Sequence, residues 1–329
     1  MEKVIFMEKK KFKLNIHLIM LLVIIMVLIM IVMKFVRFGR YITQEEIDAI
    51  PVPGNAELQT YDNIIPLWAE DDGTFPADDG VTTVLFLGNV FADDKDSPDN
   101  PCNLFAEAVG ATVYNCAIED SHMSSFNATP QCTEYPMDVF SFYWLTTVFT
   151  MDNRQIVDLA YENMEEIPEE LQKSIETLEK LDFRTVDVIY VMYDGSDFLD
   201  GRPVTNPENA ADPQTFAGAV AAGIELIKGH YPWIRIVVMS PTYAFGVAED
   251  GSYISSDSKV YGGSKLSAYV IQESAVADLL EVSFVDCFYG AIHEDIAADY
   301  LIDNIHLNAD GKVLVAERME EALQTGLTE

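Results

Sequence analysis

The stretch that decides the fold is VLFLGNVFADD, residues 84–94. Its first four residues are apolar, Gly88 and Asn89 follow as a turn, and an acidic loop comes next. A buried strand that ends in a glycine turn is typical of parallel sheets, where such turns present functional groups at the carboxyl edge. Val90 stands where this pattern leads us to expect a polar side chain, and a valine offers no nucleophile.

Strand-like and helical patterns alternate after this point. The continuous apolar runs typical of strands covered on both faces lie at 83–89, 111–118, 186–193, 234–243 and 282–288. Helical patterns lie at 101–109, 137–151, 169–181, 213–230, 265–281 and 308–326, with Asn308 as an N-cap. The alternation predicts a flavodoxin-like three-layer α/β/α fold with a five-stranded parallel sheet, in which ligands bind beyond the carboxyl ends of the strands.

Residues 14–33 are almost entirely apolar and, at 1.5 Å per residue, would span roughly 30 Å as a helix, the thickness of a bilayer core. The alternatives are a buried core helix and a cleaved signal peptide. The run lacks periodic polar positions, and no small-residue cleavage site or lipidation cysteine follows it. We therefore favour a single-pass signal anchor at 14–36, with a cytoplasmic basic tail at 1–13, a stalk or linker at 37–80 and an extracellular domain at 81–329.

The charge outside the N-terminal region is strongly negative. Residues 41–329 carry 12 basic and 52 acidic side chains, a formal net charge of −40. Such a domain repels phosphate backbones, which argues against a nucleic-acid partner. We expect no metal and no cofactor, because the cysteines fit no zinc pattern. The four cysteines are Cys102, Cys116, Cys132 and Cys287. Two possibilities stay open: all four are isolated thiols, or one disulfide joins Cys116 to Cys132 or to Cys102.

Polar loops follow the predicted strands, and a further one precedes the last helix. Their sequences are GNVFADD (88–94), YNCAIEDSHMS (114–124), YDGSDFLDGRPV (193–204), SPTYAFG (240–246) and DNIHLNADG (303–311). In the last of them Asp303 stands three residues before His306. A carboxylate at this spacing orients an imidazole and stabilises its protonated form, which is the arrangement of a general base.

In order and spacing, these segments resemble the SGNH (GDSL-type) hydrolase family, especially its membrane-anchored Gram-positive members. The resemblance covers roughly residues 80–325. In that family a serine after the first strand is the nucleophile, and a histidine three residues after an aspartate is its base. A glycine N–H in the second motif and an asparagine side chain in the third complete the oxyanion hole. The resemblance therefore implies that His306 is the base and Asp303 its orienting partner.

Three positions depart from the family pattern. The nucleophile position is Val90, the glycine position is Asp120 (or Glu119 if the register shifts by one), and the asparagine position is Ser196. Val90 cannot form an acyl-enzyme. Each oxyanion donor contributes roughly 3–4 kcal/mol. Asp120 keeps a backbone donor but brings a carboxylate towards the developing charge, whereas Ser196 still offers a hydroxyl.

Two classes of function follow from the resemblance, and the enzyme status stays open. The first is a degenerate domain that binds an acylated or glycan ligand of the cell envelope, or partners cell-envelope enzymes. The alternative is an active carbohydrate esterase or O-acyltransferase that acts on an envelope polysaccharide through Asp303 and His306. Ser121 and Ser196 are the candidates for a displaced nucleophile. The residues that we expect to bind substrate are Asn89, Asn115, Ser121 and Asp197.

Overall fold

The computed structural model describes residues 60–66, 76, 79–258, 260–261 and 263–328. The predicted basic tail and signal anchor lie outside the described residues, as does most of the predicted stalk. Within the described part of the chain, no helix combines the length and the apolar character needed to span a membrane.

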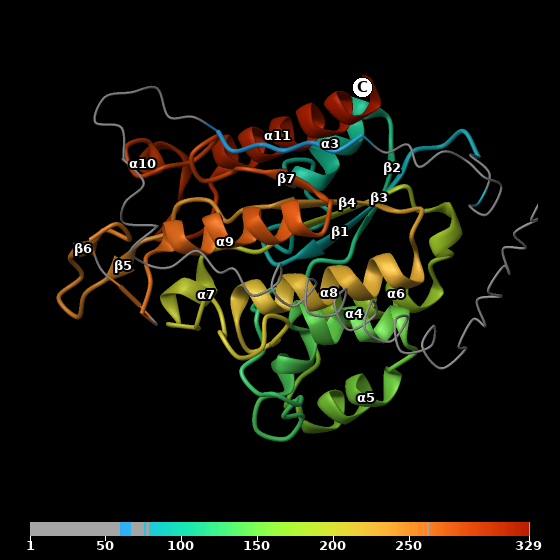
Figure 1. Cartoon of the computed structure of the whole chain (residues 1–329), viewed down its shortest axis with the longest axis horizontal. Helices are drawn as coiled ribbons and strands as arrows, with labels where there is room; N and C mark the ends of the chain where they lie inside the picture. The colour runs from blue at the N-terminus through green and yellow to red at the C-terminus, as the bar shows by residue number, and fades with distance from the viewer. Residues whose placement is uncertain (1–59, 67–75, 77–78, 259, 262, 329) are drawn as a thin grey trace, which may run out of the picture. The chain divides into compact units, whose positions relative to one another are not determined.

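The centre of the domain is a parallel sheet of five strands in the order β2-β1-β3-β4-β7 (Figure 1). The predicted α/β fold with five parallel strands is confirmed, and each strand is shorter than its apolar run. Every residue of four of these strands is buried, because helices cover both faces of the sheet. The bounds are β1 Thr83–Gly88, β2 Thr112–Asn115, β3 Val188–Met192, β4 Arg235–Met239 and β7 Ser283–Val285.

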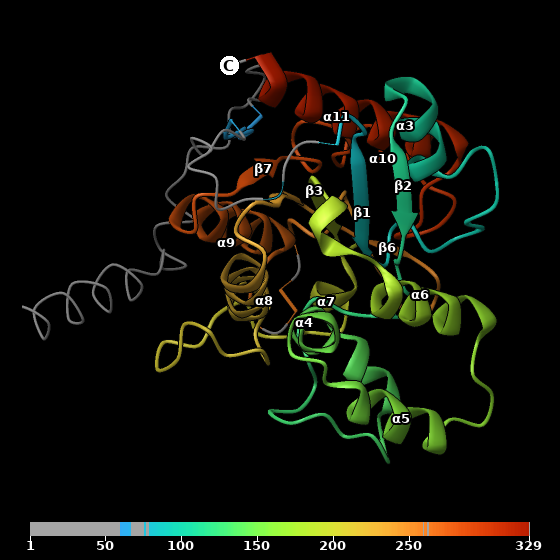
Figure 2. The same ribbon diagram turned by 90° about the vertical axis from the view of Figure 1, so that its right-hand side faces the viewer.

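Helices form a layer on each face of the sheet (Figures 1 and 2). One layer contains α3 (Pro101–Val109) and α11 (Ala309–Thr328), which pack against each other. The other contains α4 (Phe142–Thr150), α6 (Glu169–Lys180), α8 (Phe216–His230) and α9 (Leu266–Leu279). Short elements that the sequence patterns did not predict are α5 (Arg154–Asn163), α7 (Ser196–Leu199), α10 (Ala297–Tyr300) and the hairpin of β5 (Gly246–Val247) and β6 (Tyr253–Ile254).

The aromatic stretch predicted as one helix at 137–151 is two elements. A 3-10 helix, η1 (Pro136–Phe140), precedes α4. The rings of Phe140 and Phe142 are fully buried, as expected for core residues. Gly223 of α8 lies directly beside Phe142, since a Cβ there would lie 2.4 Å from the Phe142 ring. A glycine therefore allows α4 and α8 to pack closely.

Residues 60–66, which lie in the segment predicted to be a stalk or an N-terminal wrap, pack on the outer strand β7. Asn63 pairs antiparallel with Phe284 through two backbone hydrogen bonds of 2.9 and 2.8 Å. Asp62 accepts a hydrogen bond from the Asp286 backbone (2.8 Å) and pairs with Arg318 of α11. This segment covers the open edge of the sheet, which blocks pairing with another chain there.

The four cysteines are free thiols, so neither of the two disulfides considered from the sequence forms. Cys102, Cys116 and Cys287 are fully buried. Burial raises the pKa of Cys116 to about 12, which keeps this thiol protonated and unreactive.

Glu273 of α9 is a buried carboxyl whose two oxygens have no hydrogen-bond partner among the described residues. Burial, and then the charge of Asp197, raise its pKa well above the ordinary value. In the unfolded chain the Glu273 carboxyl ionises near pH 4.3. Above that pH, folding requires this carboxyl to take up a proton, and the free energy that this costs grows as the pH rises. We expect Glu273→Met to raise the free energy of unfolding at pH 7 by about 1–3 kcal/mol.

The measurement is urea unfolding of both proteins between pH 4 and pH 8. The stabilisation should shrink towards pH 4, where the unfolded chain also holds the proton. A Glu273→Met protein that is less stable than the wild type at pH 7 would show that the carboxyl has a partner that matters.

Candidate functional site

The turn after β1 depends on Gly88. Its φ is +123°, and a Cβ at this position would lie 1.8 Å from the backbone oxygen of Met192 in β3. The next residue, Asn89, donates its backbone N–H to the same oxygen at 3.3 Å. Only glycine lets β1 and β3 approach so closely here. Asn89 and Val90 are thereby fixed at the carboxyl edge of the sheet.

The side chain of Asn89 joins this turn to the loops that follow β2 and β3, the strands on either side of β1. Its Nδ2 donates to the Ser121 backbone oxygen (3.1 Å), and its Oδ1 accepts from the Asp194 backbone N–H (2.9 Å). The side-chain amide therefore holds the loops after β2 and β3 against the turn after β1.

The other residues predicted to bind substrate also hold loops. Asn115 donates to the Phe91 backbone oxygen (2.8 Å), and the buried Ser121 hydroxyl donates to the Ile118 oxygen (2.7 Å). The buried Asp197 carboxylate accepts the N–H groups of Met123 (2.9 Å) and Ser124 (3.0 Å). In the structure, the hydrogen bonds of these residues hold their loops in place. Substrate binding by these residues stays a prediction.

Asp303 and His306 form a hydrogen-bonded pair. Asp303 Oδ1 accepts the backbone N–H groups of Ile305 (2.9 Å) and His306 (2.8 Å), so the carboxylate turns back over its own loop. This leaves Oδ2 for the ring of His306, whose Nδ1 lies 2.7 Å away. The tautomer with a proton on Nδ1 leaves Nε2 as the basic atom. The Asp-x-x-His spacing therefore fixes the orientation of the His306 imidazole through contacts within one loop.

The charges around this pair favour a protonated imidazole. Partial burial lowers the pKa of His306, but the hydrogen bond and charge of Asp303 and the charges of Asp194 and Asp93 outweigh it, and the pKa is raised. The pKa of Asp303 is lowered, because the bonds from His306 and Ile305 outweigh the effect of its partial burial. The side chain of His306 is 66% exposed, so solvent reaches the base.

We expect Asp303→Asn to lower the pKa of His306, because the amide keeps the loop bonds but removes the negative charge beside Nδ1. NMR titration of the imidazole measures this pKa directly. Asp310→Asn, which removes an exposed carboxylate in the first turn of α11, is the matched control and should change it much less. An unchanged His306 titration in Asp303→Asn would contradict the role of Asp303.

The three residues at which the sequence departs from the SGNH pattern, Val90, Asp120 and Ser196, lie after β1, β2 and β3. Val90 is half-buried against the core. Asp120, and not Glu119, has the left-handed conformation that glycine favours, with φ +57°. Within the described residues, the backbone N–H groups of Val90 and Asp120 have no hydrogen-bond acceptor. The buried Ser196 hydroxyl also lacks a partner there. Donors remain at all three positions although their side chains differ from the family pattern.

Several charged residues near the loops were not predicted from the sequence. Asp93 pairs with Lys312 of α11. The negative charges of Asp93 and Asp194 both favour a higher pKa of His306. His122 pairs with Asp200 at 2.9 Å. The sequence signal was weak, because these side chains come from separate loops and only the folded sheet edge brings them together.

Comparison with solved structures gives low-identity matches across the domain. One structure matches at a TM-score of 0.51 and 18% identity, over 74% of this chain and 97% of that chain. A carbohydrate acetylesterase from Sinorhizobium meliloti matches at a TM-score of 0.42 and 14% identity, over 74% of this chain and 99% of that chain. A protein provisionally described as an SGNH hydrolase, from Slackia heliotrinireducens, matches at a TM-score of 0.40 and 14% identity, with the same coverage.

No protein-family model and no curated protein sequence matches the chain. The structural likeness at these identities concerns the fold alone. The Asp303–His306 pair lies just before the last helix, where the resemblance noted in the sequence places an Asp-x-x-His motif. The match at a TM-score of 0.51 shows that the chain shares its α/β fold with that structure, and the structures described as an acetylesterase and an SGNH hydrolase are similar to it at lower TM-scores.

Proposed function

We propose that this chain is a membrane-tethered, extracellular SGNH-hydrolase-like protein that has lost ester hydrolysis and binds an acylated or glycan ligand of the cell envelope. The observation that carries the proposal is a paired Asp303 and His306 in a chain whose nucleophile position is Val90. His306 and Asp303 are paired at 2.7 Å, and the turn that would present a serine presents Val90. Without a hydroxyl there, the base has no nucleophile to deprotonate.

Neither alternative serine is placed to replace the missing nucleophile. The Ser121 hydroxyl is buried and donates to a backbone oxygen of its own loop. The Ser196 hydroxyl is buried at the start of α7. Among the described residues, no hydrogen bond joins either hydroxyl to His306. These contacts support loss of the attack step rather than its transfer to another loop.

Ligand binding is supported by the donors that remain. The N–H groups of Val90 and Asp120 follow the neighbouring strands β1 and β2, and neither has an acceptor among the described residues. Such donors suit the carbonyl oxygen of an acyl group. An acylated glycan offers this oxygen together with hydroxyl groups for the surrounding polar loops.

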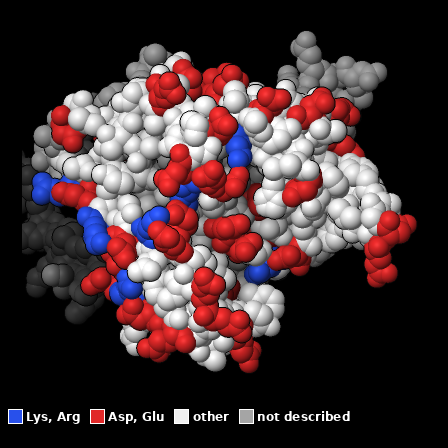
Figure 3. Space-filling view, turned by 180° about the vertical axis from the view of Figure 1, so that it is seen from behind, with Lys and Arg blue, Asp and Glu red and all other residues white. Residues whose placement is uncertain are grey.

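The tether and the location of the domain are proposed from the sequence. The apolar run at 14–33 and its flanking basic residues favour a signal anchor with the acidic domain outside the cell. Acidic side chains are spread over the face shown in Figure 3. This surface supports the exclusion of nucleic acid as a partner.

The test is hydrolysis of 4-nitrophenyl acetate by the full chain and by its His306→Ala variant. We expect the two proteins to show the same rate, at the level of the uncatalysed reaction. Turnover that disappears in His306→Ala would overturn the degenerate interpretation and support the active esterase or O-acyltransferase. Binding is measured separately, by calorimetry with methyl 6-O-acetyl-glucoside.

A further inference from the structure

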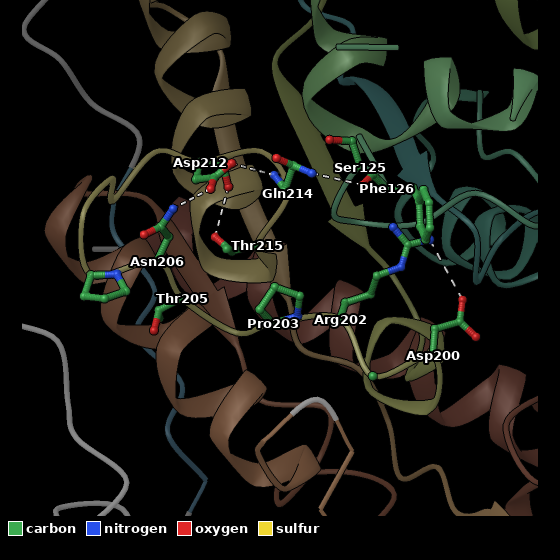
Figure 4. Close-up of a pocket in the computed structure, with 12 residues that line it drawn as sticks. Ser125, Phe126, Asp200, Arg202, Pro203, Thr205, Asn206, Asp212, Gln214 and Thr215 are labelled. Carbon is green, nitrogen blue, oxygen red and sulfur yellow. Dashed lines mark hydrogen bonds and ion pairs between the residues drawn. The ribbon is translucent and has the colours of Figure 1, made fainter. Parts of the chain in front are cut away.

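An open cavity of about 610 Å³, lined by both polar and apolar groups, lies beside the loops that follow β2 and α7 (Figure 4). Ser125 and Phe126 line it from one loop, and residues between 200 and 215 line it from the other. His306 and Asp303 are not among its lining residues. Its volume is within the range of about 300–1,000 Å³ that small-molecule sites occupy.

Arg202 supplies a positioned and largely unused group of donors to this cavity. Its guanidinium carbon lies 5.2 Å from the centre of the Phe126 ring, which fixes the plane of the group. Its hydrogen bond to the Ser124 backbone oxygen is long, at 3.5 Å, and its nearest carboxylate, Asp200, is 3.9 Å away. A guanidinium has five N–H donors. Most of them are therefore open to a ligand.

Asp200 has a second partner, His122, so its carboxylate is shared between His122 and Arg202. Its Oδ2 lies 2.9 Å from Nε2 of His122. Burial lowers the pKa of His122, but the bond to Asp200 and the charges of Asp197 and Asp200 outweigh it and raise the pKa, with Arg202 acting in the opposite direction. The His122–Asp200 pair holds the carboxylate in place and leaves the charge of Arg202 available.

Acceptors occupy the other side of the cavity. The Asp212 carboxylate is held by Asn206 Nδ2 (2.6 Å) and by the Gln214 backbone N–H (3.0 Å). Gln214 Nε2 donates to the Phe126 backbone oxygen (3.0 Å), which leaves its Oε1 as an acceptor. Figure 4 shows Asp212 and Asn206 on the side opposite Arg202 and Asp200. Arg202 thus supplies donors at one end, beside the Asp200 carboxylate, and Asp212 supplies acceptors at the other.

We propose that this cavity binds a sugar acid, with its carboxylate on Arg202 and its hydroxyl groups on Asp212 and Gln214. The planar fork of a guanidinium matches a carboxylate in geometry as well as in charge. Hydroxyl groups supply the donors that the acceptor side requires. The inference rests on the proposed function in one respect, since it assigns the glycan ligand a carboxylate and a second contact region.

Other ligand classes fit this cavity less well. An alkyl chain would leave Arg202, Asp212 and Gln214 without partners in a desolvated site, which costs free energy for each group. A phosphate ester carries more negative charge than a carboxylate and would meet Asp200 and Asp212 as well as Arg202. A neutral sugar would satisfy the acceptors but would leave the guanidinium without a counter-charge.

The experiment measures binding of D-glucuronate and of D-glucose to the full chain by saturation-transfer NMR and calorimetry. We expect glucuronate to bind at least about 10-fold more tightly than glucose, because a charge-assisted pair is the main difference between them. Arg202→Gln should remove this preference, and Arg202→Lys should restore only part of it, because lysine keeps the charge but loses the fork.

Arg184→Gln is the matched control, since it removes an equal charge from an exposed position outside the cavity. It should leave both affinities unchanged. If Arg202→Gln fails to fold, Asp212→Asn serves as the second variant and should weaken both sugars. Equal binding of glucose and glucuronate to the wild type, or unchanged glucuronate binding in Arg202→Gln, would overturn the inference.

The two proposals fail in distinguishable ways. Absence of glucuronate binding to the wild-type chain, while methyl 6-O-acetyl-glucoside still binds, contradicts the sugar-acid site alone. Esterase turnover that depends on His306 contradicts the degenerate interpretation but leaves glucuronate binding through Arg202 intact.

Discussion

The double variant Val90→Ser, Asp120→Gly is expected to hydrolyse 4-nitrophenyl acetate at least about 100-fold faster than the wild-type chain. Serine at position 90 supplies the missing hydroxyl on the turn that Gly88 and Asn89 fix at the sheet edge. The base is already oriented, with His306 Nδ1 2.7 Å from Asp303. Removing either a nucleophile or its base from a hydrolase costs several orders of magnitude in rate, so restoring one should recover part of that.

The Asp120→Gly change is needed for two physical reasons. In the proposed oxyanion site, it removes the carboxylate at the position that the resemblance assigns to a glycine donor, and each such donor contributes roughly 3–4 kcal/mol. Asp120 also has φ +57°, which glycine adopts without the cost of about 1–2 kcal/mol that other residues incur. We therefore expect Val90→Ser alone to gain less than about 10-fold.

The controls separate catalysis from altered folding. Val90→Ala, Asp120→Gly makes the same backbone change without a hydroxyl, and it should remain at the wild-type rate. Adding His306→Ala to the double variant should return its rate to the same level. Robust hydrolysis by Val90→Ser alone would show that Asp120 does not oppose the charge. No gain in the double variant would show that the base and the turn no longer face each other.

The parts of the fold that were predicted from sequence are those set by short-range pattern. A strand covered on both faces must be apolar throughout, and so the five runs identified the five strands and their parallel pairing. The Asp303–His306 pair could also be predicted from the sequence. A separation of three residues lets the Asp303 carboxylate accept hydrogen bonds from the backbone amides of Ile305 and His306 and from the His306 ring. Asn308 does cap α11, through its bond to the Gly311 backbone N–H (2.9 Å).

The parts that were missed depend on contacts between distant segments. The backbone of Asn63 is hydrogen-bonded to that of Phe284, more than two hundred residues later in the sequence. The composition of the segment around Asn63 gives no indication of this pairing. Arg202 is one residue of a loop rich in turn formers, and its role depends on Phe126 from another loop. The cavity exists only after both loops are folded, so neither sequence alone indicates it.

The second large effect is expected in Gly88→Ala, which should lose more than about 4 kcal/mol of the free energy of unfolding. A Cβ at position 88 would lie 1.8 Å from the Met192 oxygen, an atom of the backbone that cannot rotate away. Relief requires β1 and β3 to separate, which breaks the bond from the Asn89 N–H to that oxygen and opens the core. The measurement is urea unfolding of the full chain, with the soluble yield recorded.

Gly110→Ala distinguishes the clash from backbone strain. Gly110 also has a positive φ, +70°, but a Cβ there would meet nothing within 4 Å. It should cost only the strain of the left-handed conformation, about 1–2 kcal/mol. If Gly88→Ala is no less stable than Gly110→Ala, the close approach of β1 to β3 is not required for folding. A larger loss at Gly88 means that the packing of β1 against β3 requires a glycine in this turn, whichever residue occupies position 90.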